Sequence, residues 1–288
     1  MSRKKKNQFS RAAMAAFFIV LAAVFAVLAF SRASHPSKQT MQTVGESLTD
    51  EVTQTVTETT QPPIAAPTRA DTGKTPEPGE KVIYLTFDDG PTENTSKIMD
   101  ALDRYGVKGT FFVVHSYDGC EKQIKEIYDR GHQIGLHTYS HRYEIYRSQD
   151  TYFADLNKIS DLVYNATGYR CKLVRFPGGS SNTISRKYCS GIMSTLTKEL
   201  TNRGYTYFDW NADSFDASER VASVEKIVNR SVSSIGQLDQ IILLMHDALL
   251  KTTTVEALPQ IIEAYRDAGY RFDVLSENSF VAHHTVNN

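Results

Sequence analysis

Two histidines and two neighbouring aspartates have residue types and spacings that suit a metal ion. Residues 137–141 have the sequence HTYSH, and residues 86–90 have the sequence TFDDG. A spacing of four residues places both imidazoles on one face of a helical turn, within reach of one ion. One carboxylate with two histidines is a recurring set of three ligands that leaves positions open for water and substrate. Together the two motifs predict a catalytic metal site.

Each motif also has an explanation that involves no metal. Acidic residues and glycine commonly form the turn that leaves a strand, which would account for residues 86–90. His137 and His141 could instead cap the backbone or face solvent. Neither motif decides the matter alone, and their combination favours the metal site.

An open metal site produces a nucleophile, because the ion lowers the pKa of bound water from about 15.7 to about 7. The reaction then needs a base for the proton of the water and an acid for the leaving group. Asp88 and Asp89 are able to divide two tasks, one as ligand and one as base. His246 is the candidate acid, since it directly follows the apolar run 241–245.

His246 has an alternative interpretation as a buried structural histidine. A carboxylate close to it would favour the role of acid, because an anion keeps an imidazole protonated. Asp213 and Asp216 are both candidates for that carboxylate.

An alternation of strands and helices after residue 79 provides the elements that would position these groups. Short β-branched or aromatic runs alternate with longer stretches of helical period, which is typical of βαβ units. The expected strands are 82–87, 110–114, 133–136, 173–176, 205–209, 241–245 and 272–275. The expected helices are 96–105, 121–130, 151–166, 192–203, 221–235 and 255–268. This pattern predicts an α/β fold. Because the sequence has no glycine-rich nucleotide loop, it favours a (β/α) barrel, which need not be complete, rather than an open doubly wound sheet.

The expected barrel places the ionisable residues at one rim, because reactive groups gather at the C-terminal ends of its strands. Charged and imidazole groups directly after apolar runs are costly unless they are paired or bound to metal. The residues that follow the first, third, fourth, fifth and sixth strands are Asp88 and Asp89, His137 and His141, Arg175, Asp209 with Asp213 and Asp216 beyond it, and His246.

The overall composition is that of a globular protein, with 41% apolar residues, 23% charged residues and a net charge of -1. Residues 1–30 contain five cations and no acid. Because the whole chain has a net charge of only -1, the rest of the chain is negative, and residues 80–288 are mildly acidic. A domain without an excess of cations is poorly suited to neutralise phosphates, which argues against nucleic acid as the main partner. Nothing in the composition implies a protein partner.

Residues 12–30 are uncharged and mostly apolar, and this length predicts a transmembrane helix that acts as a signal anchor. The preceding segment, residues 1–11, is basic, which places the N-terminus in the cytoplasm and the rest of the chain outside. We therefore expect a single-pass protein of the cell membrane with an extracellular catalytic domain. The alternative is a signal peptide that is cleaved near residues 31–33.

Residues 31–79 contain fifteen Ser or Thr and six Pro but no Phe, Tyr or Trp. Such a segment cannot bury enough apolar surface to offset the entropy of ordering, so we expect a disordered linker. The catalytic domain is then residues 80–288. Near its end, His283 and His284 are expected to belong to a frayed terminus.

Three cysteines, Cys120, Cys171 and Cys189, allow at most one disulfide within the chain. The favoured pair is Cys171 with Cys189, which would brace the segment around Arg175. No CxxC motif occurs, so a thiolate metal site is not expected.

Five segments, taken in order, resemble the motifs of the polysaccharide deacetylase family, carbohydrate esterase family 4, whose catalytic unit is the NodB homology domain. The fold that this resemblance implies is a distorted (β/α) barrel, and the likeness covers residues 80–275. The five segments are residues 86–90, 137–141, 175–179, 210–216 and 244–246.

The resemblance implies which residues bind the metal ion. Asp89, His137 and His141 occupy the ligand positions of the first two motifs. The cofactor that it implies is one divalent ion, and we expect Zn²⁺.

The resemblance also implies the residues that move protons and hold the oxyanion. Asp88 is at the position of the base and Arg175 at that of the residue that orients it. The backbone N–H of Gly178 is at the position that helps to hold the oxyanion. His246 is at the position of the acid, and Asp216 is the residue expected to support it.

Two positions depart from the family pattern. Gly178 stands where many members have an aromatic residue such as Tyr, and Ala217 stands where the fourth motif usually ends in Trp. Two apolar walls of the sugar groove are therefore reduced, which leaves substrate choice open. Trp210, Tyr207 or Phe208 would supply a stacking surface instead, unless these residues pack in the core.

The function that the resemblance implies is removal of N-acetyl groups from an extracellular, acetylated glycan polymer. A domain beside the membrane favours peptidoglycan, at its N-acetylglucosamine, over soluble chitin fragments. N-Acetylmuramic acid and O-acetyl xylan stay open as substrates. A non-haem iron oxygenase would use the same three ligands but requires neither Arg175 nor His246. A glycan-binding domain without activity is the other alternative, although every ligand, acid and base position is filled.

Overall fold

The computed structural model describes residues 73–287. The predicted basic segment 1–11, the predicted transmembrane helix 12–30 and most of the predicted linker 31–79 lie outside these residues. Within residues 73–287, no helix combines the length and the apolar character that crossing a membrane requires.

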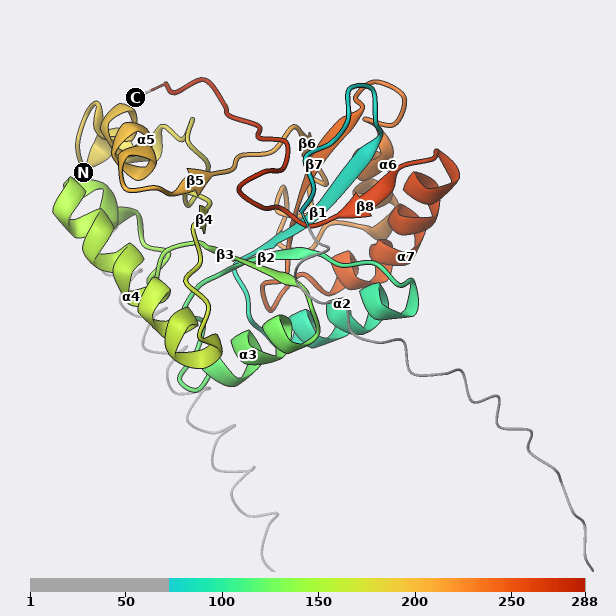
Figure 1. The fold of residues 1–288 in the computed structure, drawn as a ribbon, viewed down its shortest axis with the longest axis horizontal. Coiled ribbons are helices and arrows are strands. Elements are labelled where there is room, and N and C mark those ends of the chain that lie inside the picture. The colour runs from blue at the N-terminus through green and yellow to red at the C-terminus, as the bar shows by residue number, and fades with distance from the viewer. Residues whose placement is uncertain (1–72, 288) are drawn as a thin grey trace, which may run out of the picture. The chain divides into compact units, whose positions relative to one another are not determined.

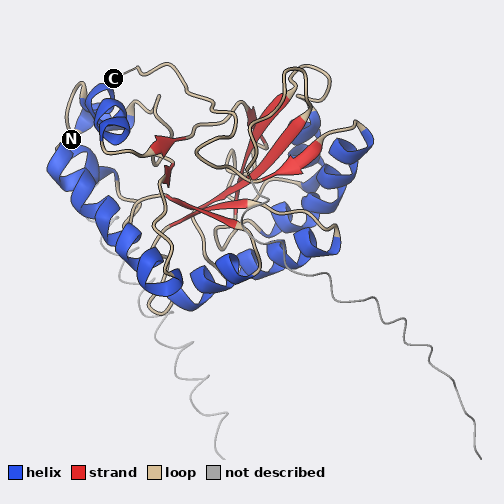
Figure 2. Cartoon of the chain, viewed as in Figure 1, coloured by secondary structure: helices blue, strands red, loops and turns tan. Residues whose placement is uncertain are grey.

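Strands and helices alternate through residues 73–287, as the sequence predicted, and helices lie around the outer side of the strands (Figures 1 and 2). The strands are β1 (Val82–Asp88), β2 (Thr110–Val113), β3 (Gln133–Leu136), β4 (Leu173–Val174), β5 (Thr206–Tyr207), β6 (Ala212–Asp213), β7 (Gln240–His246) and β8 (Arg271–Asp273). The α-helices are α2 (Glu93–Arg104), α3 (Glu121–Asp129), α4 (Gln149–Thr167), α5 (Ile192–Asn202), α6 (Val224–Val232) and α7 (Thr252–Asp267). Two 3₁₀ helices are η2 (Tyr143–Arg147) and η3 (Ile184–Lys187).

The strands form one parallel sheet in the order β5-β4-β3-β2-β1-β7-β6. β1 pairs with β7 along its whole length, and on its other side it pairs first with β8 and then with β2. β8 is thus inserted beside the N-terminal half of β1. Within the described residues β5 and β6 do not pair with each other, so the α/β sheet is an incomplete (β/α) barrel.

β1 is buried along its whole length, which explains its nearly continuous apolar sequence, VIYLTFD. A central parallel strand is covered on both faces, so its residues do not alternate between apolar and polar. The strand ends at Asp88, which is itself buried. β7 has the same character and ends at His246.

The start of α2 fixes the loop that leaves β1. Thr92 is the N-cap, its side chain accepts a hydrogen bond from Asn94 N, and Thr95 completes a capping box. An N-cap of this kind stabilises a helix by about 1 kcal/mol. The loop that carries Asp89 is therefore held between a buried strand and a capped helix.

Strands β4, β5 and β6 are only two residues long, and the sequence did not predict β6 at all. Single backbone hydrogen bonds continue the pairing beyond the strand limits, from Arg175 N to Leu136 O and from Phe208 N to Val174 O. Short strands give too few residues for a periodic pattern, which is why β6 has no signal in the sequence.

Residues 73–79, which the sequence assigned to the linker, are joined to the folded unit by hydrogen bonds. Gly73 N and Lys74 N donate to the carboxylate of Asp273, and Ser276 Oγ donates to Gly73 O. The predicted boundary at residue 80 is therefore too late.

The predicted disulfide between Cys171 and Cys189 is wrong. None of the three cysteines forms a disulfide. Cys171 is buried, and its Sγ donates to the carbonyl of Ile134 in β3 at 3.0 Å. Cys189 is half-buried and donates to Ser190 O instead. The Cys171 side chain thus packs into the sheet.

The prediction of a frayed terminus at His283 and His284 is also wrong. The ring of His283 stacks on Tyr207 with centroids 3.8 Å apart, and His284 N donates to Asp209 Oδ2 at 2.8 Å. These contacts hold the C-terminal segment against the connection between β5 and β6, where the barrel is open. Figure 1 shows this segment running back toward α5.

Candidate active site

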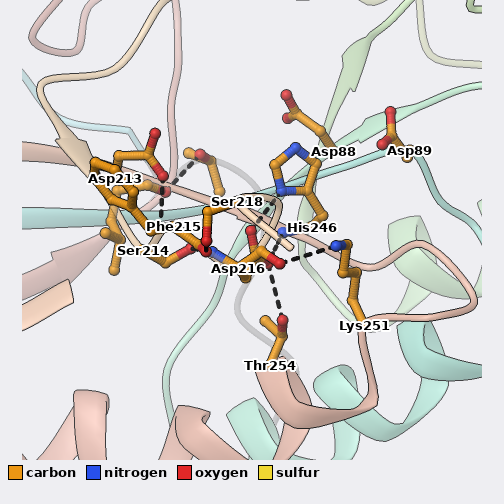
Figure 3. Close-up of polar contacts among 12 residues, drawn as sticks. Asp88, Asp89, Asp213, Ser214, Phe215, Asp216, Ser218, His246, Lys251 and Thr254 are labelled. Carbon is orange, nitrogen blue, oxygen red and sulfur yellow. Dashed lines mark hydrogen bonds and ion pairs between the residues drawn. The ribbon is translucent and has the colours of Figure 1, made fainter. Parts of the chain in front are cut away.

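The functional residues that the sequence predicted meet at the C-terminal ends of the strands. Asp88 ends β1 and His246 ends β7, and the two residues are register partners across this parallel pair. Figure 3 shows the carboxylates of Asp88 and Asp89 on one side of the His246 ring and Asp216 on the other. The expected rim is therefore present.

Asp89, His137 and His141 form the cluster that the sequence predicted. Asp89 Oδ1 lies 3.2 Å from His141 Nε2 and 3.6 Å from His137 Nε2. One ligand atom from each residue lies within 4.8 Å of the other two. Among residues 73–287 no other group of three His, Cys, Asp or Glu residues is arranged in this way.

The Oδ1 atom of Asp89 tests whether a metal ion fits this cluster. It is buried and has no hydrogen-bond partner among the described residues. A buried acceptor without a partner costs about 1–3 kcal/mol, and more when it is charged. The nearest groups are imidazole nitrogens, which suit the same ion as the carboxylate. The three residues therefore fit a divalent cation.

The ring of His137 is oriented by a backbone carbonyl. Its Nδ1 lies 2.8 Å from Arg175 O, so Nδ1 carries the proton and Nε2 offers its lone pair to the cluster. Burial, and next the nearby His141, lower the pKa of His137 to about 3, although Asp89 opposes the shift. A neutral imidazole in this tautomer is the form that binds metal.

The expected helical turn between His137 and His141 is not present. Thr138 and His141 have positive φ angles of 67° and 52°, so this segment is a loop. The two rings nevertheless lie close, with centroids 4.9 Å apart. Asp155 of α4 holds the loop, because its Oδ1 accepts hydrogen bonds from two successive backbone N–H groups, those of Tyr139 and Ser140. The sequence analysis missed Asp155, which has no signal except its place on a predicted helix.

Asp88 and Arg175 form a buried ion pair beneath the cluster. Arg175 Nη1 donates to Asp88 Oδ1 at 2.8 Å, and the Arg175 side chain is fully buried. Burial raises the pKa of Asp88, and the charge of Arg175 opposes this shift only in part. The other oxygen, Oδ2, lies 3.7 Å from His137 Nε2 and so faces the cluster.

Each of the three side-chain nitrogens of Arg175 donates a hydrogen bond, and four of its five N–H groups are used. Its remaining hydrogen bonds go to Thr86 Oγ1, Phe208 O and Asp209 O. The guanidinium also lies over the ring of Phe112, 4.1 Å from its centroid. Arg175 therefore has one available position, and it fixes the orientation of Asp88.

His246 pairs with Asp216, which decides between the two predicted carboxylates. Asp216 Oδ1 lies 2.7 Å from His246 Nδ1, and Asp216 Oδ2 accepts from His246 N at 2.8 Å. Burial alone would lower the pKa of His246, but Asp216 outweighs it and raises the pKa to about 9. The same contacts keep the pKa of Asp216 below its ordinary value in spite of burial.

Asp213 and Asp209, which the sequence also placed at this rim, have structural contacts. Asp213 Oδ1 accepts from Phe215 N. Asp209 is buried and accepts from both the backbone N and the hydroxyl of Ser180. It thereby fixes the turn that follows residues 175–179.

Gly178 is exposed in the turn after β4, and its N–H takes part in no hydrogen bond within residues 73–287. Its φ is 76°, which favours glycine, and an added Cβ would lie 2.7 Å from the hydroxyl of Tyr143. Burial, and then the charge of Asp89, raise the pKa of Tyr143, which places this phenol near the cluster. Tyr143 of η2 thus occupies the space beside Gly178.

Only one of the three predicted stacking residues remains partly exposed. Phe208 is fully buried, and Tyr207 is buried with His283 stacked on its ring. Trp210 is half-buried and packs closely against Gly179. Phe208 and Tyr207 are therefore core residues, and Trp210 keeps an accessible edge.

Asp247 is a buried residue of the site that the sequence analysis missed. Its Oδ2 accepts from Thr95 Oγ1, and its backbone N donates to Asp88 O at 3.0 Å. Its other oxygen has no partner among the described residues, and burial raises its pKa to about 7. Gly90 lies against this carboxylate, where a Cβ would come within 1.9 Å of Oδ2. A charged residue directly after an apolar strand was the available signal.

Comparisons with known proteins place the chain in one family. The sequence profile described as polysaccharide deacetylase matches residues 75–192. YheN of Bacillus subtilis (strain 168), which carries the name of a candidate polysaccharide deacetylase, is 32% identical over 212 residues, or 71% of each chain. The chain belongs to the polysaccharide deacetylase family. The expected resemblance is therefore confirmed, and the protein is a deacetylase that acts as a hydrolase.

Relatives whose names include a substrate also support the assignment of this chain to the polysaccharide deacetylase family. A peptidoglycan-N-acetylglucosamine deacetylase of Bacillus cereus is 28% identical over 209 residues, 69% of this chain and 71% of that protein. The crystal structure of the catalytic domain of peptidoglycan N-acetylglucosamine deacetylase from Eubacterium rectale is similar with a TM-score of 0.71 and 42% identity. It covers 76% of this chain and 99% of that domain.

Proposed function

We propose that this deacetylase removes the N-acetyl group from N-acetylglucosamine in peptidoglycan, with a divalent metal ion as cofactor. The observation that carries the proposal is the unpartnered, buried Oδ1 atom of Asp89 beside two imidazoles, with Asp88 and His246 at the same rim. The names of the Bacillus cereus and Eubacterium rectale proteins support the choice of substrate.

The ion would be held by Asp89 Oδ1 and by the Nε2 atoms of His137 and His141, and we expect Zn²⁺. This nitrogen and oxygen set suits zinc, and three protein ligands leave positions open. When bound, such an ion supplies Lewis-acid chemistry, because it lowers the pKa of a water molecule and polarises a carbonyl.

Asp88 is the proposed base that accepts a proton from the attacking water. Its Oδ1 is held by Arg175, so Oδ2 is the oxygen that stays directed at the cluster. A raised pKa makes this carboxylate a better proton acceptor. We expect Asp88→Asn to lower kcat by about 10²–10⁴, the usual range of general base catalysis, with the metal content unchanged.

The backbone N–H of Gly178 is the proposed donor to the oxyanion that forms from the acetyl carbonyl. It lies on an exposed turn, and hydrogen bonds of Asp209 to Ser180 fix that turn. One preorganised donor of this kind is typically worth about 10²–10³ in rate.

His246 is the proposed acid that donates a proton to the departing amine. With a pKa raised to about 9, it is protonated at neutral pH. Asp216 bonds to Nδ1, so the proton on Nε2 is the one that would be transferred. The base and the acid are thus separate groups on β1 and β7.

We also propose that residues 12–30 anchor the chain in the cell membrane with residues 80–288 outside. The apolar stretch and the basic residues before it support this location. We expect the full-length chain in the membrane fraction of cells that express it. Recovery of that chain in the soluble cytoplasmic fraction would overturn the location.

Acetate release by the full-length chain tests the reaction. Purified protein is incubated with peptidoglycan, chitin oligomers and acetylated xylan, each with zinc and with a chelator. We expect acetate from peptidoglycan only when zinc is present, and free glucosamine, not muramic acid, in the hydrolysed product.

Three outcomes would contradict parts of this proposal. Acetate from xylan alone would make the protein an ester hydrolase. Free muramic acid would show that the deacetylated sugar is N-acetylmuramic acid. Binding to peptidoglycan without release of acetate would make the chain a glycan-binding protein.

Asp118→Asn is a matched control for the Asp88 variant, because the Asp118 side chain is fully exposed.

A further inference from the structure

Asp216 is held by residues from the start of α7 as well as by His246. Thr254 Oγ1 donates to Asp216 Oδ2 at 2.9 Å. Lys251 Nζ donates to the backbone carbonyl of Asp216 at 2.9 Å. Figure 3 shows Thr254 on the side of Asp216 away from the His246 ring, and Lys251 to one side of Asp216.

Lys251 fixes the loop that carries Asp216. Its ammonium group also donates to the carbonyls of Glu219 at 3.1 Å and Arg220 at 3.5 Å. Three carbonyl acceptors from one short segment use all three N–H groups of a lysine. The main chain from Asp216 to Arg220 is therefore tied to the segment between β7 and α7.

Thr254 fixes the carboxylate itself. Thr254 is fully buried in the first turn of α7, and its hydroxyl donates across to Asp216. A buried hydroxyl without a partner is costly, so this bond holds both groups in place. The start of α7 also carries the positive end of the helix dipole, which favours a carboxylate.

The contacts of Asp216 divide between its two oxygens. Oδ2 accepts from Thr254 Oγ1 and from His246 N, while Oδ1 faces His246 Nδ1. With Oδ2 fixed on two sides, the carboxylate cannot rotate away from the ring. The ring nitrogen that is not bonded to Asp216 is therefore held on the side of Asp88 (Figure 3).

We propose that Thr254 is a positioning residue of the reaction: its hydroxyl fixes Asp216, and through Asp216 it aims His246 at the leaving amine. The proposal rests on the proposed function, because it takes His246 as the acid. Thr254 itself touches neither the cluster nor the substrate in this assignment.

Thr254→Val tests the hydroxyl, because valine keeps the shape and removes the donor. We expect kcat on acetylated glycan to fall at least ~10-fold, a part of the ~10²–10⁴ that acid–base catalysis supplies, with KM unchanged. Thr254→Ser restores the hydroxyl and should restore most of kcat. Thr252→Val is the control, since Thr252 is exposed in the same turn of α7 and should keep full activity.

An aryl acetate separates positioning of the acid from damage to the fold. The phenolate of 4-nitrophenyl acetate departs without a proton, so its hydrolysis does not need His246. We expect Thr254→Val to change this rate less than twofold. An equal loss on glycan and on aryl acetate, or no rescue by Thr254→Ser, would overturn the proposal.

A double-mutant cycle with Asp216→Ala tests the path through Asp216. If Thr254 acts only through this carboxylate, adding Thr254→Val to Asp216→Ala causes no further loss of kcat. A further loss equal to that in the wild-type background would overturn the proposal.

A measurement without turnover separates failure of this proposal from failure of the proposed function. In NMR spectra of the metal-free protein, the Nδ1–H of His246 should give a protected, downfield proton signal. We expect Thr254→Val to weaken it and Thr252→Val to leave it. An unchanged signal would overturn the positioning role. Absence of glycan activity in the wild-type chain, with this signal present, would overturn only the proposed function.

Discussion

Two buried pairs, His246 with Asp216 and Asp88 with Arg175, raise the pKa of His246 and of Asp88 for different reasons. Burial works against the charged form in both pairs. At His246 the partner prevails, because Asp216 bonds to the ring and also to the backbone N. At Asp88 burial prevails, although Arg175 lies 2.8 Å away. The raised pKa of His246 suits the proposed acid, and the raised pKa of Asp88 makes this carboxylate a stronger proton acceptor, as the proposed base requires.

Asp216→Asn should lower the pKa of His246 from about 9 toward its ordinary value, because the amide has no charge. The alkaline limit of kcat should shift to lower pH with it. NMR titration of His246 in the metal-free protein measures the shift directly. Because the pKa of His246 is higher in the folded protein than in the unfolded chain, protonation of His246 adds to the free energy of unfolding. This contribution is complete below pH 6.5 and disappears as pH rises to about 9. An unchanged titration in the variant would show that Asp216 is not the cause.

Gly90→Ala should disrupt the loop that carries Asp89. The added Cβ would lie 1.9 Å from Asp247 Oδ2, and this carboxylate is buried and cannot move into solvent. Overpacking of this kind costs about 1–3 kcal/mol. Denaturant unfolding and metal binding should both show a loss. Gly119→Ala is the comparison, because a Cβ there meets nothing within 4 Å, although its positive φ adds some strain.

At the scale of elements, the proposed metal ligands lie on loops rather than on helices. The segment from His137 to His141 has two residues with positive φ, so it needs support from outside. Asp155 on α4 supplies that support through two backbone N–H groups. α7 similarly supports the loop before α6 through Lys251 and Thr254. Helices on the outside of the barrel thus determine the geometry at its rim.

Asp155→Ala should weaken metal binding without removing a ligand. Loss of an outer support typically lowers metal affinity by about 10–100-fold. Asp161→Ala on the same helix is the control, because Asp161 is exposed and, within residues 73–287, pairs only with Arg170. Titration with zinc and a competing chelator measures both variants. Equal affinities for the two variants would mean that the loop keeps its shape without Asp155.

At the largest scale, one core and one open edge account for the architecture of residues 73–287. The buried apolar residues of the sheet and helices form a single cluster that includes both β1 and β7. The barrel is open between β5 and β6, and the C-terminal segment is bound there through His283 and His284. The segment that the sequence assigned to a frayed end therefore belongs to the fold.

Zinc should stabilise the folded protein against heat. Binding at a ligand concentration of 100 Kd adds about 2.7 kcal/mol to the free energy of unfolding. For a folded unit of this size, we expect Tm to rise by roughly 5–10 °C. The rise should be absent in Asp89→Ala, which removes the unpartnered oxygen. An equal rise in both proteins would mean that zinc binds elsewhere.

The local patterns of the chain determined the type and order of most elements and the residues of the site. Apolar runs that end in ionisable groups, such as 241–245 before His246, carry that information because a buried strand has to expose its polar residues at an end. The spacing of His137 and His141 predicted that the two imidazoles lie close together, and they do, although the expected helical turn between them is a loop.

Contacts between distant segments were decided by the tertiary structure alone. No local pattern shows that Asp216 rather than Asp213 faces His246, that Asp155 holds the histidine loop, or that Cys171 packs against β3 and away from Cys189. Each of these contacts joins residues brought together by packing, and pairing energies at such sites depend on burial and direction. Sequence spacing fixes neither quantity. The sequence therefore determines which residue types are present, and the tertiary structure determines which residues contact each other.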